Sequence, residues 1–183
     1  MNQTIETIKN RRSVRNYLPE QVKDEDMEII LETAVYAPTG HNDQPWHFTV
    51  IQNPELINEI NIGAKEAMGK TGEKWLENLS KNENYHIFHG APTVVIVSGK
   101  KNATTPHADC SAAVENMLLA AESMNIGSCW IGFAAFYFKN PESFKKFDIP
   151  EENDVYFGVT FGYKAKENGE APKRNRNVVT FFK

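Results

Sequence analysis

The sequence has little of what a disulfide framework, a metal centre or a membrane anchor requires. Its 183 residues include two cysteines, Cys110 and Cys129, which lie far apart and form no CxxC pair. Neither a disulfide-rich fold nor a zinc site is therefore expected. The first residues contain no apolar stretch of the signal-peptide kind, and the longest apolar runs, such as 131–138, are too short to span a bilayer. These absences predict a cytoplasmic protein with no membrane segment.

An excess of charge of one sign is also missing. The formal net charge is -4, with 24% charged and 40% hydrophobic residues. Such a composition is ordinary for a globular domain and excludes wholesale disorder. A modest negative charge argues against general binding to nucleic acid or to anionic membranes. The length suits one domain, so residues 1–183 are predicted to form a single unit.

Arginine is absent from the whole middle of the chain. The five arginines are Arg11, Arg12, Arg15, Arg174 and Arg176, and residues 16–173 contain only lysine as a permanent cation. The forked guanidinium group suits phosphate and carboxylate, and lysine does not replace it there. This placement indicates anion binding by two short terminal segments. A lysine-rich chain with a few stray arginines is the alternative explanation.

Hydrophobic spacing predicts an irregular mixture of helices and strands. Helices are expected over 3–11, 24–36, 54–68, 108–126 and a short stretch from 141, and strands over 46–51, 92–98, 155–163 and 178–182. Residues 69–90 are only weakly periodic and are expected to form a mobile helical excursion or lid. Residues 127–133 are expected to turn into buried chain, and residues 164–177 to form a polar linker. The order lacks regular βαβ alternation, which indicates an α+β fold.

The last predicted strand, VVTFF at 178–182, is apolar, terminal and distant from the rest of the domain. An unpaired strand of this kind is prone to aggregation. It is therefore expected to pair with a sheet, its own or that of another subunit. The alanine-rich helix over 108–126 is expected at the centre of the structure or at a subunit interface.

Conventional catalytic motifs are also absent. The chain contains no GxSxG, no HExxH, no Walker A motif and no GxGxxG after a strand. His86 and His89 have no acidic residue nearby, so surface or lid histidines are favoured over a metal site. A chain with no nucleophile, metal or acid–base pair of its own can still catalyse through a bound cofactor.

Three groups of residues are candidates for holding such a cofactor. RRSVR at 11–15 suits a phosphate, although a solvated basic patch explains it equally well. Asn42 and Gln44, in the loop 37–48, have amides that can read the edge of a polar heterocycle, and a plain turn is the alternative. GSCWIGF at 127–133 lets backbone N–H groups approach a ligand, and PKRNR at 172–176 has the cations to complete a phosphate site. The alternatives for these two are a loop and a linker.

Together these segments resemble the FMN-dependent nitroreductase family. RRSVRNY, APTGHNDQPWHF, APTVVIV, the helix ending in NIGSCWIG and the terminal GY…PKRNRNVV follow the family order over nearly the whole chain. The resemblance implies a homodimer and a three-layer sandwich in which helices flank a central antiparallel sheet. It also implies an FMN at the dimer interface, touched by both subunits. The arm formed by 164–183 would reach the partner, with its strand exchanged between subunits.

The resemblance also implies roles for particular residues. Arg11, Arg12, Ser13 and Arg15 match family positions that hold the FMN phosphate, ribityl chain and ring edge. Asn42 and Gln44 match a loop that meets the isoalloxazine from the other subunit, and Ile131 and Gly132 match the segment under flavin N5. Arg174, with Lys173, matches a C-terminal ligand of the phosphate. The spacing leaves Arg176 as an alternative to Arg174. Some members have an acidic residue where this chain has Ile131, which leaves a backbone N–H as the donor to N5.

The activity implied by the resemblance is that of an oxidoreductase. NADH or NADPH would reduce the flavin through N5, and an electron-poor acceptor such as a nitroaromatic or a quinone would reoxidise it in a ping-pong cycle. No catalytic side chain and no metal ion are predicted. A related flavin enzyme such as a reductive dehalogenase, a non-catalytic flavin-binding or redox-sensing module, and an interaction domain without a cofactor remain as alternatives.

Overall fold

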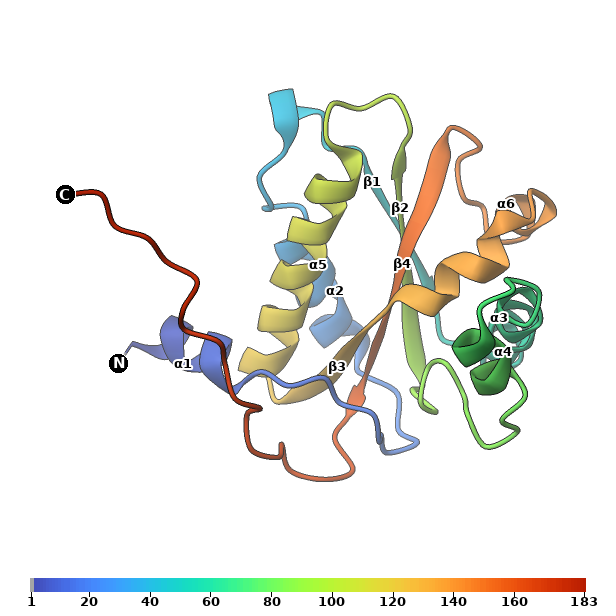
Figure 1. Ribbon diagram of the computed structural model, residues 1–183, viewed down its shortest axis with the longest axis horizontal. Coiled ribbons are helices and arrows are strands. Elements are labelled where there is room, and N and C mark those ends of the chain that lie inside the picture. Colours follow the sequence, from blue (N-terminus) through green and yellow to red (C-terminus); the bar gives the residue numbers. More distant parts are fainter. Residues whose placement is uncertain (1) are drawn as a thin grey trace.

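Helices and strands follow one another irregularly in the computed structural model, which describes residues 2–183 (Figure 1). In chain order the elements are α1 (Gln3–Asn10), α2 (Asp24–Ala34), the 3-10 helix η1 (Gly40–Asn42), β1 (Trp46–Ile51), α3 (Pro54–Met68), α4 (Lys74–Ser80), β2 (Thr93–Lys100), α5 (Pro106–Ser123), β3 (Ile126–Ile131), the 3-10 helix η2 (Gly132–Lys139), α6 (Glu142–Lys146) and β4 (Asn153–Tyr163).

The strands form one four-stranded sheet in the order β1-β2-β4-β3, and every neighbouring pair is antiparallel. Helices α2 and α5 cover one face of the sheet, and α3, α4, η2 and α6 lie on the other (Figure 1). The predicted α+β fold, with a central antiparallel sheet between helical layers, is therefore confirmed.

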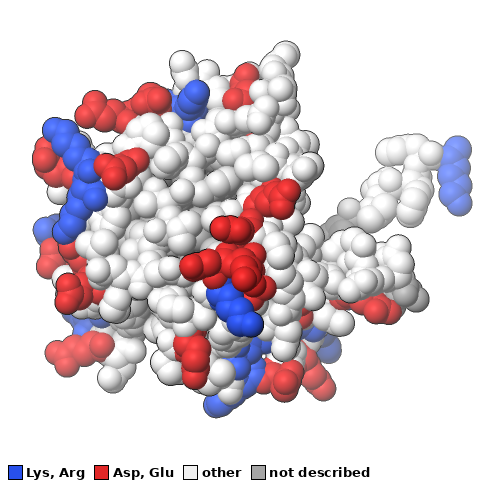
Figure 2. Space-filling view, turned by 180° about the vertical axis from the view of Figure 1, so that it is seen from behind, with Lys and Arg blue, Asp and Glu red and all other residues white. Residues whose placement is uncertain are grey.

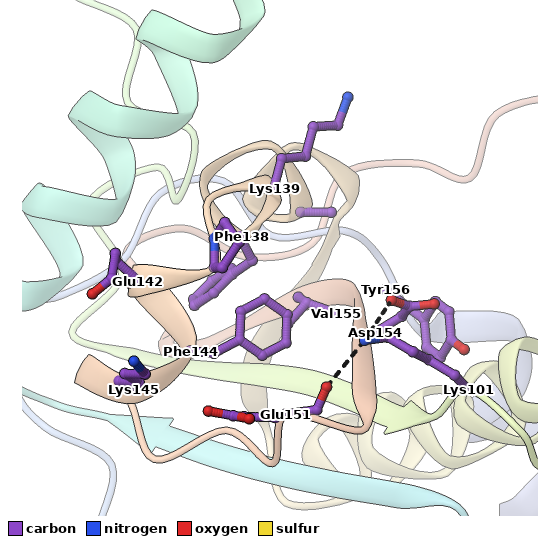
Figure 3. A pocket seen from close by; sticks show the side chains of 12 residues that line it. Lys101, Phe138, Lys139, Glu142, Phe144, Lys145, Glu151, Asp154, Val155 and Tyr156 are labelled. Atoms are coloured by element: carbon purple, nitrogen blue, oxygen red, sulfur yellow. Dashed lines mark hydrogen bonds and ion pairs between the residues drawn. The ribbon is translucent and has the colours of Figure 1, made fainter.

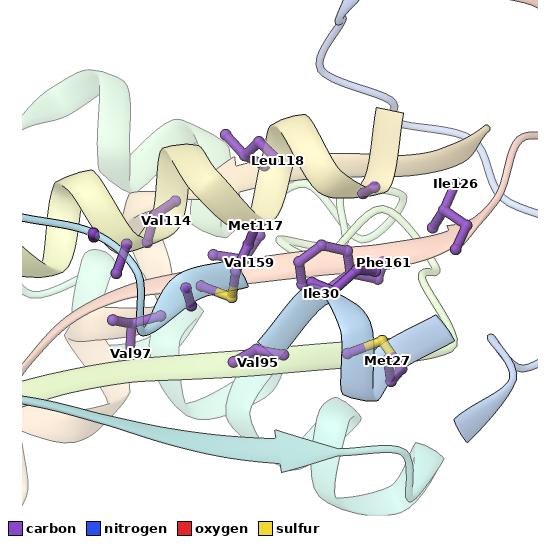
Figure 4. Close-up of a cluster of buried hydrophobic side chains, with 14 of the residues drawn as sticks. Met27, Ile30, Val95, Val97, Val114, Met117, Leu118, Ile126, Val159 and Phe161 are labelled. Atoms are coloured by element: carbon purple, nitrogen blue, oxygen red, sulfur yellow. The ribbon is translucent and has the colours of Figure 1, made fainter. Parts of the chain in front are cut away.

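The alternation of side chains along β2 explains why its sequence is continuously apolar. Val95 and Val97 point toward α2 and α5, where they join a buried cluster with Met117 and Phe161 (Figure 4). Val94 and Ile96 belong to the second buried cluster, on the side of α3. A strand covered on both faces needs apolar residues at every position.

One strand was missed by sequence reasoning. The helix predicted over 108–126 ends at Ser123, and residues 126–131 form β3 rather than a turn. Asn125 adopts a left-handed backbone, with a φ of 58°, which stops the helix. β3 then pairs with β4, from Ile126 opposite Tyr163 to Ile131 opposite Gly158. Glycine and serine lower the strand propensity of this segment, but pairing with a distant strand outweighs that local preference.

The segment 69–90, expected to be a mobile excursion, packs against α3. Leu76, Ile87 and Phe88 are buried in the second core cluster. The Lys65 ammonium group donates to the carbonyl oxygens of Asn82 and Tyr85 at 2.7 and 2.9 Å. The segment is thus fastened by both apolar burial and hydrogen bonds, and its role as a lid stays a prediction.

The C-terminal arm leaves the body of the protomer (Figure 1). Residues 171–183 are exposed throughout and form neither helix nor strand. The strand predicted at 178–182 is therefore not formed within one protomer, and its exchange with a partner stays a prediction. Within the described part of the chain, no helix is long and apolar enough to cross a membrane.

Candidate functional site

The arginine-rich segment after α1 lies along the edge of β3. The Val14 N–H donates to the Ser128 carbonyl at 2.9 Å, and Ser13 pairs with Ser128 as an isolated parallel bridge. This close approach requires Gly127, because a Cβ there would lie 2.9 Å from a methyl carbon of Val14 and 3.1 Å from the Gly162 carbonyl oxygen. Sheet pairing therefore holds the segment in one place.

Arg11 has donors that the protein itself does not satisfy. Its Nε is buried and has no hydrogen-bond partner among the described residues. The same atom lies 3.5 Å from Oε1 of Glu115, which counts as an ion pair but lacks hydrogen-bond geometry. Arg15 is exposed and makes one long bond, 3.4 Å from Nη1 to the Ser13 carbonyl. An unsatisfied buried donor is costly, so Arg11 is suited to a ligand that brings an acceptor.

Arg12 is occupied differently. Its Nη1 donates to the carbonyls of Lys9 and Arg11, both at 2.8 Å, and its Nε donates to the Gly169 carbonyl at 3.2 Å. Arg12 thus binds the last carbonyls of α1 and fastens the start of the C-terminal arm. The phosphate contact predicted for it stays a prediction, and the structure gives this side chain a positioning role.

An open space lies at the end of β3. Ile131 is buried, whereas Gly132 is exposed and a Cβ built on it would meet no atom within 4 Å. Burial raises the pKa of the Cys129 thiol, and Arg15, the Ser13 hydroxyl and Arg11 oppose that rise. These groups are therefore near one another, and the thiol stays protonated at neutral pH.

The loop with Asn42 and Gln44 is held at the N-terminal end of α5. His41, Asn42 and Gln44 all have positive φ angles, of 52°, 59° and 44°. Asp109 in the first turn of α5 accepts the Gly40 N–H and the Thr105 hydroxyl. The Gln44 amide donates to the Asn42 amide oxygen at 3.1 Å. Both amides are exposed, so they are available to a ligand or a partner.

The two predicted halves of the site lie at different places along α5. Arg11 contacts Glu115, in the middle of the helix, whereas the loop with Asn42 and Gln44 is anchored at its beginning. In Figure 1, α1 lies beside the C-terminal end of α5 and the loop of η1 beside its N-terminal end. One protomer therefore does not bring the amides to the arginines.

Comparison with known proteins identifies the family. The sequence profile described as "Nitroreductase family" matches residues 8–163. The chain belongs to the nitroreductase family. A Bacteroides fragilis nitroreductase solved with bound FMN is 37% identical over the full length of both chains, with a TM-score of 0.92. A Desulfitobacterium hafniense nitroreductase with bound FMN, 25% identical over the full length of both chains, has a TM-score of 0.91.

Curated relatives of this nitroreductase-family chain carry several activities in their names. An Archaeoglobus fulgidus protein, provisionally named an NADH dehydrogenase/NAD(P)H nitroreductase, is 34% identical over 91% of this chain and 88% of its own length. An iodotyrosine deiodinase of Thermotoga neapolitana is 27% identical over 98% of this chain and 96% of its own length. Family membership thus leaves the acceptor open.

The cationic residues of the arm lie outside the body of this nitroreductase-family protomer. Lys173, Arg174 and Arg176 are exposed, and no hydrogen bond or ion pair joins them to other described residues. Among the described residues, the last hydrogen bond between the arm and the body is the one that Gly169 accepts from Arg12. Five fully extended residues span at most about 17 Å, so Arg174 can reach a ligand beside Arg11 only if the arm folds back or the ligand belongs to a partner. Its phosphate role stays a prediction.

A groove of about 740 Å³ lies away from these residues, between η2, α6 and the start of β4 (Figure 3). Its floor includes Phe138, Phe144 and Tyr156, and none of the predicted site residues lines it. Figure 2, the view from behind, shows basic and acidic side chains intermixed over the surface it displays. The groove itself is lined by Lys101, Lys139 and Lys145 together with Glu142, Glu151 and Asp154, so its cations are balanced by an equal number of acids. Arg11, Arg15 and the end of β3 therefore remain the candidate site. No group of three potential ligand side chains in residues 2–183 is placed to hold a metal ion.

Sequence reasoning missed an aromatic cluster near Arg15. The ring of Phe133 lies 6.2 Å from the ring of Trp75 and 6.5 Å from that of Tyr85, and Tyr85 lies 6.0 Å from His89. Trp75 is 59% exposed. The weak periodicity of 69–90 gave no sign that its rings would meet the residue after Gly132.

Proposed function

We propose that the chain is an FMN-dependent NAD(P)H oxidoreductase that reduces electron-poor acceptors such as nitroaromatics or quinones. The observation that carries the proposal is the buried Nε of Arg11, which has no hydrogen-bond partner among the described residues, in a segment held along β3, the strand that leads to the open space at Gly132. Two relatives with this fold contain FMN, and a Bacillus subtilis relative, 25% identical over 98% of this chain, is named FMN reductase (NADPH).

The residues at this place fit FMN. Arg11 and Arg15 supply donors for a phosphate or a ring edge, and Ser13 supplies a hydroxyl on the same segment. At Ile131 and Gly132 the backbone reaches an open surface where an N–H group can meet a flat ring. This arrangement supports the predicted cofactor residues on the body of the protomer.

Bound FMN would supply the redox chemistry, by accepting hydride from NADH or NADPH and passing it to the acceptor. The chain's own groups bind and orient the reactants. Burial and the nearby Cys129 raise the pKa of Tyr85, against the effect of Arg15, so this phenol stays protonated and able to donate a hydrogen bond. The Cys129 thiol is also held protonated, which argues against a thiolate nucleophile in the reaction.

A second copy of the chain would complete the site. The arm carries Val178, Val179, Phe181 and Phe182 with exposed fractions of 69%, 64%, 77% and 97%. The sheet has two edge strands, β3 and β1. The segment 11–15 lies along the outer edge of β3, which leaves the outer edge of β1 as the candidate for pairing. We infer that 178–182 pairs with β1 of the partner, which would satisfy an open edge and bury the apolar arm. The same two-fold arrangement would bring the partner's amide loop to the arginines.

The test is to purify the protein with FMN and follow its colour, mass and turnover. A yellow dimer that oxidises NADH or NADPH only when menadione or 4-nitrobenzoate is present would support the proposal. A yellow protein with no turnover would instead favour a flavin-binding module, and a colourless one would count against the cofactor. Release of iodide from 3-iodotyrosine would favour a dehalogenase, the alternative that the Thermotoga relative brings forward.

A further inference from the structure

The helix η2 follows directly on β3 and is wound in an uncommon way. It runs as a 3-10 helix for eight residues, from Gly132 to Lys139. Runs of 3-10 helix longer than three or four residues are rare, because their hydrogen-bond geometry is poorer than that of an α-helix. The first residue of η2 is Gly132, where a Cβ would meet no atom within 4 Å. Contacts with the rest of the fold therefore have to hold η2 in this form.

One carboxylate joins η2 to two other helices. The Tyr137 hydroxyl donates to Oε1 of Glu59 at 2.7 Å, and the Lys146 ammonium group donates to Oε2 of the same carboxylate. Glu59 lies on α3, Tyr137 on η2 and Lys146 on α6. We call these three residues the Glu59 cluster. The hydrogen bonds from Lys146 and Tyr137 lower the pKa of Glu59, so the carboxylate stays charged at neutral pH.

A glycine of α3 makes room for the Tyr137 ring. A Cβ at Gly63 would lie 2.5 Å from Cδ2 and 2.8 Å from Cε2 of Tyr137, so the ring lies directly on the backbone of α3. The next residue of η2, Phe138, is buried, and its ring lies 5.6 Å from the ring of Phe147. The Tyr137 ring lies 5.9 Å from the same Phe147 ring. The C-terminal half of η2 is thus fixed in rotation as well as in position.

The winding of η2 relates this fixed half to Gly132. A 3-10 helix advances about 2.0 Å and turns about 120° per residue, whereas an α-helix advances about 1.5 Å and turns about 100°. Tyr137 lies five residues after Gly132. A change to α-helical winding would therefore bring the two ends about 2.5 Å closer and turn them by about 100° relative to each other. Because the Glu59 cluster holds Tyr137, that displacement would fall on Gly132.

We propose that Glu59 is a positioning residue, which acts through Tyr137 to keep the backbone at Ile131 and Gly132 in the place that a flavin ring requires. The inference rests on the proposed binding of FMN over Gly132. N5 of oxidised flavin accepts a hydrogen bond, whereas N5 of reduced flavin carries a hydrogen and no longer accepts one. A backbone N–H held beside N5 therefore stabilises the oxidised form more than the reduced form. Loss of the Glu59 cluster should weaken the binding of oxidised FMN more and so raise its reduction potential.

The first measurement needs no flavin. Amide hydrogen exchange of residues 132–139 is followed in the FMN-free protein. Glu59→Ala and Tyr137→Phe are each expected to speed this exchange about tenfold, because a hydrogen bond to a carboxylate is lost. Glu59→Gln should stay within about threefold of the wild type, because its amide oxygen can still accept the Tyr137 hydroxyl. Glu66→Ala is the matched control, since Glu66 lies seven residues further along α3 and its side chain makes no hydrogen bond or ion pair with other described residues.

The second measurement compares the two oxidation states of FMN on the protein. In Glu59→Ala the Kd of oxidised FMN is expected to rise about tenfold more than the Kd of reduced FMN, which corresponds to a reduction potential about 30 mV higher. Tyr137→Phe should shift the potential in the same direction. Glu59→Gln and the control Glu66→Ala should leave the potential at the wild-type value.

Two results would overturn this inference. Unchanged exchange of residues 132–139 in Glu59→Ala would show that the Glu59 cluster does not hold η2. A wild-type potential in Glu59→Ala, with both oxidation states bound more weakly by the same factor, would show a general loss of stability instead of positioning. In either case the wild type would still bind FMN and oxidise NAD(P)H, so the proposed function would stand. A wild type that binds no FMN would refute the proposed function and this inference together.

Discussion

Replacing Arg11 by alanine should separate cofactor binding from folding. The Arg11–Glu115 ion pair is partly exposed, with 25% and 44% of the two side chains accessible. A pair of this kind contributes about 0–1 kcal/mol to the free energy of unfolding. In a protein of this size, 1 kcal/mol shifts Tm by about 2–4 °C. The protein without FMN is therefore expected to lose at most about 4 °C when Arg11 is replaced.

The loss of FMN affinity should be much larger. A hydrogen bond from a guanidinium group to a phosphate is charge-assisted and contributes about 1.5–3 kcal/mol. Arg11→Ala is thus expected to raise the Kd for FMN about 10- to 150-fold. The Arg11 Nε forms no hydrogen bond within the protein and its ion pair with Glu115 is partly exposed, so the ligand bears most of the effect.

Arg12→Ala provides the contrast. Its guanidinium is already bonded to the carbonyls of Lys9, Arg11 and Gly169, so its removal frees the end of α1 and the start of the arm. A loss of about 1–2 kcal/mol in stability, and about 2–8 °C in Tm, is expected for the protein without FMN. The double variant Arg11→Ala/Arg12→Ala should be colourless yet folded.

The assay measures the Kd for FMN by titration of the apoprotein and Tm by circular dichroism. If Arg11→Ala binds FMN as tightly as the wild type, the assignment of the phosphate site is wrong. If Arg11→Ala loses more stability than Arg12→Ala, the structural role assigned to Arg12 is wrong.

Three further predictions follow from the same geometry. Gly132→Ala should leave Tm of the apoprotein unchanged, because its Cβ enters open space, but the same methyl group should weaken FMN binding there about tenfold. Gly158→Ala is the contrast and should lower Tm, because its Cβ would lie 2.9 Å from the Ala134 Cβ. Burial lowers the pKa of His86 and His89 in the folded protein below the value of 6.5 that they have when unfolded. The free energy of unfolding that depends on their neutral imidazoles is therefore fully present above about pH 6.5, and it is lost as the pH falls toward the pKa values of the folded protein. Urea unfolding between pH 7.5 and 5 should show this decline, and a His86→Gln/His89→Gln variant with the wild-type slope would contradict it. Deletion of 178–183 should lower the molar mass measured by light scattering from that of a dimer toward that of a monomer. A variant that stays a dimer would show that the arm is not the main contact between the two subunits.

Local pattern was enough to predict most of the elements. Asp24–Ala34 forms a helix because Met27, Ile30 and Ala34 repeat at helical spacing and bury one face. Asn53 caps α3 through the N–H groups of Glu55 and Leu56, as its position before a proline indicated. These features depend on residues a few positions apart, so the sequence determines them without knowledge of the rest of the fold.

The same sequence did not reveal β3 or the aromatic cluster of Trp75, Tyr85 and Phe133. β3 exists because residues 126–131 pair with β4, about thirty residues further along the chain. The aromatic cluster exists because α4, the loop that follows it and η2 pack against one another. Contacts between remote segments depend on how whole elements pack, and residue spacing within any one segment does not encode them.

The candidate site shows the same division. The sequence by itself determined which chemistry is available: guanidinium groups kept to the two chain ends, paired amides in one loop and glycines around Ile131. Only the tertiary structure decided that Arg11 keeps an unused donor while Arg12 is bound to backbone carbonyls. It also decided that Asn42 and Gln44 lie beside the N-terminal end of α5, whereas Arg11 contacts the middle of that helix. The physical reason is that residue type sets what a group can bind, whereas three-dimensional placement sets what remains free to bind it.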